Sequence, residues 1–126
     1  MSGWRSLGIE LGTETMFFVV LEGCVALLWR YNTLLLAIAA VVCAAALARW
    51  HSRFDICFFF VIGVLGSLAE VAFVQFGGWE YANPTILGVP VWFPLAFGTT
   101  ALIGGRLART LTSIWDKVRP LTNEES

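Results

Sequence analysis

The chain has 126 residues, of which 58% are hydrophobic and 13% are charged, and its formal net charge is −1. A soluble domain has roughly a quarter of charged residues, and one of this length could not bury so much apolar surface. The composition therefore indicates a single domain that has a lipid bilayer as its solvent. There is no run of basic residues, so we expect no nucleic acid partner.

Four apolar segments predict four membrane-spanning helices, at about residues 15–30, 33–49, 55–76 and 91–109. The third is close to the roughly 20 residues that cross about 30 Å of hydrocarbon. We expect residues 1–14 to lie along the interface and residues 77–90 to form an outer loop. In the tail, residues 110–126, the last helix should continue to Val118 and stop before Pro120. The predicted fold is an all-α integral membrane protein, a four-transmembrane-helix bundle with an ordered apolar outer loop.

Tryptophan and positive charge predict the same topology independently. Tryptophan favours the headgroup level, and four crossings place three tryptophans at each membrane face: Trp4, Trp50 and Trp115 at one, Trp29, Trp79 and Trp92 at the other. The face with the termini carries seven basic residues and the other carries only Arg30. The seven are Arg5, Arg49, Arg53, Arg106, Arg109, Lys117 and Arg119. By the positive-inside rule both termini are cytoplasmic, and we expect a multi-pass protein of a bacterial inner (cytoplasmic) membrane.

Glu70 is the first candidate ligand-binding residue, because an ionisable group within a membrane span faces protein or a wet cavity. Small residues share its helical stripe and predict close packing against another helix: Gly63, Gly66, Ser67 and Gly77. Arg30 should reach a similar depth, so we expect an Arg30–Glu70 ion pair, which is either structural or part of a ligand or proton site. Gly98, Gly104 and Gly105 mark close packing on the last helix.

Glu22 is the second carboxyl group within a span. Helix-rise arithmetic separates its depth from that of Glu70 by roughly 10 Å, which disfavours a carboxylate pair that shares a proton. We expect Glu22 to be protonated, or bonded to a hydroxyl or a backbone carbonyl of a neighbouring helix. A subunit interface is a further alternative.

The outer loop is rich in proline and glycine, which exclude a regular helix, yet it is also rich in apolar side chains. It should therefore fold back onto the bundle. Two interpretations of the loop stay open: an amphipathic cap over the helix ends, or a lid over a lipid-facing pocket. Trp79, Tyr81 and Trp92 are its candidate ligand-binding residues, and Glu80 offers a further polar contact. Pro94 falls in the first turn of the last helix, where proline is tolerated.

Nothing in the chain predicts metal or cofactor chemistry. The three cysteines, Cys24, Cys43 and Cys57, lie singly in different apolar segments, and His51 is the only histidine. Cysteines at such positions are typical small apolar filler. No Walker loop, GxSxG or HExxH motif occurs, so no catalytic residue is assigned.

Residues from about 48 to 109 resemble the last membrane helices of the Insig (insulin-induced gene) family and its small prokaryotic relatives. The resemblance is carried by Arg53-Phe54-Asp55, then Gly77, Tyr81 and Pro84, then Trp92 and Pro94, then Gly105-Arg106-Leu107-Ala108. It implies a protein that binds a sterol-like or diacylglycerol-like lipid between helices and docks to other membrane proteins. That family has six spans, whereas this chain has room for four, and its last helix reaches Arg106 some residues too soon.

A fainter likeness is to membrane carotenoid hydratases and cyclases, carried by Glu70, Gly77, Tyr81 and Val89-Pro90. It implies Glu70 as an acid that protonates a polyene double bond in a dry pocket.

These patterns favour a small, non-catalytic membrane protein that binds a lipid or isoprenoid between its helices and assembles with itself or with a larger complex. Three other classes stay open: an accessory subunit of a larger membrane complex, an isoprenoid-modifying enzyme and a small transporter. The enzyme would need Glu70 beside a closed apolar cavity. The transporter would need a polar path from Glu22 to Glu70.

Overall fold

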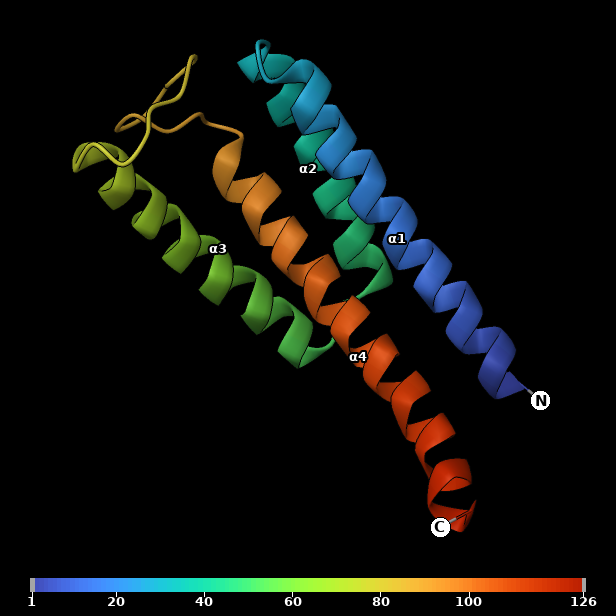
Figure 1. Ribbon diagram of the computed structural model, residues 1–126. Coiled ribbons are helices and arrows are strands. Elements are labelled where there is room, and N and C mark those ends of the chain that lie inside the picture. Colours follow the sequence, from blue (N-terminus) through green and yellow to red (C-terminus); the bar gives the residue numbers. More distant parts are fainter. Residues whose placement is uncertain (1, 126) are drawn as a thin grey trace.

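The computed structural model describes the backbone of residues 2–125 and the side-chain environments of residues 3–119. Within this range the secondary structure consists of four helices: α1 Ser2–Leu28, α2 Asn32–Arg49, α3 Arg53–Gln75 and α4 Phe93–Glu125. The helices run up and down, so that α1 begins and α4 ends at the same end of the bundle (Figure 1). We call this the terminal end and the opposite one, which carries the outer loop, the loop end.

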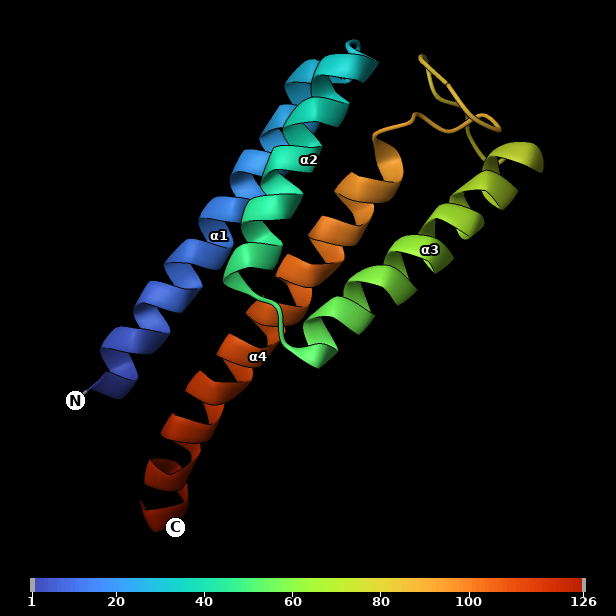
Figure 2. The same ribbon diagram turned by 180° about the vertical axis from the view of Figure 1, so that it is seen from behind.

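The helix α4 is the centre of the arrangement. It packs against each of the other three helices, and α1 also packs against α2. Figures 1 and 2 show the α1–α2 pair on one side of α4 and α3 on the other. The fully buried core side chains come from α1, α2 and α4 and the segment that follows α2: Leu21, Leu35, Trp50, Leu102 and Ile103.

Both groups of tryptophans lie at the ends of the bundle where the sequence predicts them. Trp4 lies in the first turn of α1, and the Lys117 ammonium of α4 lies 5.4 Å from the centre of its ring. Trp29 follows α1, Trp79 lies within the outer loop and Trp92 directly precedes α4. The seven basic residues of the terminal end and the single Arg30 of the loop end are separated in the same way.

Three of the described helices are long and apolar enough to cross a membrane: Gly3–Leu28, Asn32–Arg49 and Arg53–Gln75. The fourth expected span, at the start of α4, is a helix of lower hydropathy, because Arg106 and Arg109 interrupt it. The helix α4 contacts each of the other three helices, and a helix in that position can direct polar side chains toward protein.

Both ends of the chain are more helical than the sequence suggests. Residues 2–14, which fall in the expected interfacial segment, are the first half of a continuous α1. The expected stop before Pro120 is wrong, because α4 continues through it to Glu125. Proline removes one helical hydrogen bond, but its fixed φ is compatible with a helix. At 33 residues α4 is about 50 Å long, so it exceeds a hydrocarbon layer of about 30 Å.

Candidate functional site

Glu70 binds the outer loop. The indole N–H of Trp79 donates a hydrogen bond to Glu70 Oε1 at 2.6 Å, and the Tyr81 hydroxyl donates to the same oxygen. The expected ion pair between Arg30 and Glu70 is not formed. Arg30 is exposed, and its guanidinium lies 5.3 Å from the centre of the Trp29 ring. Trp79 and Tyr81, which lie only 9 and 11 residues further along the chain, just beyond the turn that ends α3, bond to Glu70 instead.

Tyr81 is held in its neutral form by this environment. Burial, the hydrogen bond to Glu70 and the negative charge of Glu70 all raise the pKa of the Tyr81 hydroxyl. A phenol is already neutral at physiological pH, and the upward shift keeps the hydroxyl a hydrogen-bond donor in alkaline solution as well. Its ring meets the ring of Phe93 edge-on, at 6.3 Å between centres, so the loop also contacts the start of α4.

A second hydrogen-bond network fastens the outer loop to the turn between α1 and α2. The Asn83 amide donates to the backbone oxygens of Trp29 and Arg30, at 3.2 and 2.8 Å. Asn32 donates to the backbone oxygen of Asn83 at 2.9 Å, and it accepts from Trp92 Nε1 at 3.1 Å. The loop is therefore ordered and folds back over the helix ends, as predicted. Trp92 is buried, while Trp79 is half exposed.

The small residues bring α3 and α4 into close contact. A Cβ built on Gly63 would lie 3.4 Å from Gly98 Cα, and one on Gly66 would overlap the ring of Phe97 at 1.9 Å. Gly63, Gly66 and Gly98 are thus packing residues, and Gly105 lies against Phe58.

Two other glycines do not have the predicted packing role. Gly77 lies in the turn after α3 with φ +84°, and a Cβ on Gly104 would meet nothing within 4 Å. The helical spacing in the sequence does not show that α3 ends at residue 75, before Gly77. It also does not show that the side of α4 on which Gly104 lies has no neighbour.

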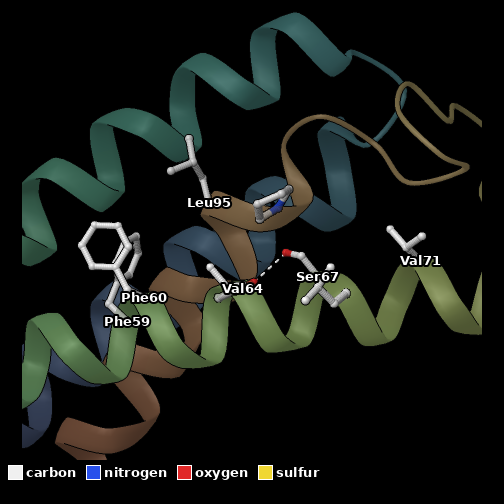
Figure 3. A pocket seen from close by; sticks show the side chains of 9 residues that line it. Phe59, Phe60, Val64, Ser67, Val71 and Leu95 are labelled. Atoms are coloured by element: carbon white, nitrogen blue, oxygen red, sulfur yellow. Dashed lines mark hydrogen bonds between the residues drawn. The ribbon is translucent and has the colours of Figure 1, made fainter.

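An apolar hollow of about 360 Å³ lies beside this contact. Figure 3 shows the side chains of Phe59, Phe60, Val64, Ser67 and Val71 along α3, with Leu95 of α4 across from them. Gly63, Leu68 and Pro94 complete the lining. The single polar side chain is that of Ser67, and its hydroxyl donates to the Gly63 backbone oxygen at 2.6 Å. The lining therefore offers a ligand apolar contacts and no free side-chain donor.

Glu22 lies on the opposite side of α4 from α3, and the Thr100 hydroxyl of α4 donates a hydrogen bond to it. The predicted hydroxyl partner on a neighbouring helix is thus confirmed. Glu22 and Glu70 do not share a site: one is bonded to Thr100 and the other to the outer loop. The rings of Phe93 and Phe97 on α4 stack 5.2 Å apart. Phe93 also contacts Tyr81, and both rings precede Thr100 along α4. They therefore lie between the hydrogen-bond partners of the two carboxyl groups.

Two buried carboxyl groups in the terminal half of the bundle form polar contacts that the sequence analysis missed. Glu14 is fully buried and accepts a hydrogen bond from Thr110 at 2.9 Å. Asp55, 3% exposed, forms an ion pair with Arg106, and Arg109 Nη1 lies 4.0 Å from its other oxygen. One signal was available: Ser52 and Asp55 have the spacing of a capping box, and they form one at the start of α3.

Within the part of the chain that the structure describes, no three or more His, Cys, Asp or Glu side chains lie together as metal ligands would. The three cysteines are free thiols on α1, α2 and α3.

When the chain is compared with protein families, curated proteins and solved structures, none of them matches it.

Proposed function

We propose that the chain is an integral membrane protein with four membrane-spanning helices that binds the hydrocarbon part of a lipid or isoprenoid in the α3–α4 hollow, without catalysis. The observation that carries this proposal is the chemistry of the lining. Of its nine residues only Ser67 has a polar side chain, and that hydroxyl is already bonded within α3. A ligand that fits there makes apolar contacts only.

The position of the hollow supports a ligand that enters from the bilayer. Its α3 residues run from Phe59 to Val71, in the middle of a helix that spans Arg53–Gln75. A volume of about 360 Å³ is within the range of about 300–1,000 Å³ typical of small-molecule sites. Helix packing in a bilayer gains little from excluding lipid, because lipid tails are as apolar as leucine. The hydrocarbon chain of a bound ligand therefore replaces bulk lipid at a site of fixed shape.

The proposed orientation places the terminal end in the cytoplasm, because seven basic residues lie there against one at the loop end. Fusion of green fluorescent protein or alkaline phosphatase to the C-terminus tests it. Fluorescence with an inactive phosphatase supports the orientation, and an active phosphatase contradicts it.

Two variants with matched chemistry test the ligand site. Val64 lines the hollow and is 55% exposed, whereas Val61, 52% exposed on the same helix, does not line it. Val64→Phe should fill the hollow, and Val61→Phe should not. Native mass spectrometry of protein released from mild detergent, with extraction of the bound lipid, should show a retained lipid in the wild type and in Val61→Phe. It should be lost in Val64→Phe. A bare wild-type protein, or equal retention in both variants, would overturn the proposal.

The other functional classes gain less support from the geometry. Glu70 is not among the residues that line the hollow, which an acid in an isoprenoid-modifying enzyme would have to reach. Within the described residues, no hydrogen bond links Glu22 to Glu70, as a transporter path would require. Assembly with itself or with a larger complex stays a prediction, and the same mass spectra count the subunits. The lipid ligand implied by the Insig resemblance is of the class proposed here.

A further inference from the structure

A second groove lies at the terminal end, between the start of α1 and the end of α2. It has a volume of about 250 Å³, and Arg5, Ser6, Ile9, Glu10 and Arg49 line it. The four α1 residues occupy one face of the helix, since positions i, i+1, i+4 and i+5 are neighbours on its surface. Arg49 is the last residue of α2, so the groove lies where α2 leaves the apolar layer.

The groove has an excess of positive charge, with two arginines and one glutamate. Glu10 forms an ion pair with Arg49 and also accepts a hydrogen bond from Trp50 Nε1 at 3.2 Å. The Arg49 guanidinium lies 5.7 Å from the centre of the Trp50 ring, and Trp50 is itself buried. Arg49 is thereby held at the groove. Arg5 is exposed and has no ion-pair partner among the described residues.

An apolar stripe continues from the groove toward the middle of α1. Ile9, Met16 and Val20 are spaced by seven and four residues, so they share one face of the helix. They are 56%, 56% and 47% exposed. On α2, Val41 is two turns before Arg49 and is 69% exposed. The surface is thus cationic at the membrane border and apolar toward the middle of α1. A phospholipid has its phosphate and its acyl chains in the same order.

We propose that this groove binds the phosphate group of an anionic phospholipid. Arg5 and Arg49 contact the phosphate oxygens, the Ser6 hydroxyl donates a hydrogen bond, and an acyl chain lies along Ile9, Met16 and Val20. Arginine suits this ligand, because its planar guanidinium matches phosphate oxygens with two parallel hydrogen bonds. The apolar stripe favours a lipid over free phosphate, which would use only the arginines. The site is separate from the α3–α4 hollow; it rests on the proposed membrane insertion but not on the ligand proposed for the hollow.

The test is a titration of delipidated wild-type protein with dioleoylphosphatidylglycerol and, separately, with dioleoylphosphatidylcholine, followed by native mass spectrometry. The wild type should prefer the phosphatidylglycerol. Arg5→Gln should weaken its binding about fivefold, as expected for one cation at an anionic lipid surface, and should leave phosphatidylcholine unaffected. Arg5 makes no ion pair with the described residues, so this variant does not disturb the α1–α2 contact.

A second variant should change phosphatidylglycerol binding in the opposite direction. Glu10 competes with the phosphate for Arg49, so Glu10→Gln should strengthen phosphatidylglycerol binding several-fold. Arg30→Gln, at the loop end, is the matched control and should change nothing. Equal binding of the two lipids, or equal effects of Arg5→Gln and Arg30→Gln, would overturn the proposal. So would displacement of phosphatidylglycerol by millimolar inorganic phosphate, which would identify a free-phosphate site.

Discussion

The two sides of α4 are held together by different kinds of contact. On the α1–α2 side, large apolar side chains are fully buried: Leu21, Leu35, Leu102 and Ile103. On the α3 side, Phe59 is the single member of the core cluster that α3 contributes. α3 is instead attached at three levels, by Asp55 to Arg106, by Gly63 and Gly66 to α4, and by Glu70 to the outer loop.

In the proposed bilayer environment this difference has a physical consequence. Apolar helix faces gain little by leaving lipid, so close backbone contact and hydrogen bonds decide where a helix docks. α3 depends on these contacts, while the α1–α2–α4 side adds interlocked side chains that must all move together. The contact of α3 with α4 is extensive, but it depends on glycines and polar groups rather than on large, fully buried side chains.

The largest effect is expected from Arg106→Leu. It leaves Asp55, whose side chain is 4% exposed, without its direct ion-pair partner, and loss of one partner from a buried pair costs about 3–5 kcal/mol. Arg109 lies 4.0 Å away and places the expected loss at the lower end of that range. Unfolding in detergent measures it.

Two variants decide whether the loss comes from the stranded carboxylate. Arg53→Leu removes an exposed arginine from the same end of α3 and should change stability little. Adding Asp55→Asn to Arg106→Leu should restore part of the lost stability, because no buried charge then remains. An equal loss in Arg53→Leu and Arg106→Leu would show that the Asp55 pair does not hold α3.

An intermediate effect is expected where α3 touches α4 through glycine. A Cβ on Gly66 would overlap the Phe97 ring, whereas one on Gly104 of α4 meets open space. Overpacking costs about 1–3 kcal/mol, and the partly exposed Phe97 ring can rotate, so Gly66→Ala should destabilise by about 1 kcal/mol. Gly104→Ala should instead stabilise α4 by up to about 1 kcal/mol, the difference in helix propensity. Stability changes of the same sign in both variants would contradict the assigned packing.

Four helices, their order and the separation of tryptophans and basic residues between the two ends of the bundle could be predicted from the sequence, because apolar runs, tryptophans and arginines are local signals. The partners of the polar residues could not. Glu70 was expected to meet Arg30, but the turn at Gly77 returns Trp79 and Tyr81 to it. Which helix faces which depends on packing around α4, and that is why the contacts of Glu14 with Thr110 and of Asp55 with Arg106 appear only in three dimensions.

The smallest effect on overall stability is expected at the third attachment of α3, where Glu70→Leu removes the acceptor for Trp79 and Tyr81. Trp79 is 48% exposed and can bond to water or headgroups, so the global cost should stay below about 1 kcal/mol. The local effect should be larger. Hydrogen exchange should accelerate in residues 77–82 and in the last turn of α3, while Asn83 stays bonded to the α1–α2 turn.

Glu80→Leu, an exposed neighbour, is the control. If exchange instead rises across the whole loop, the α1–α2 side depends on Glu70 as well, and the two sides of α4 are coupled through the loop.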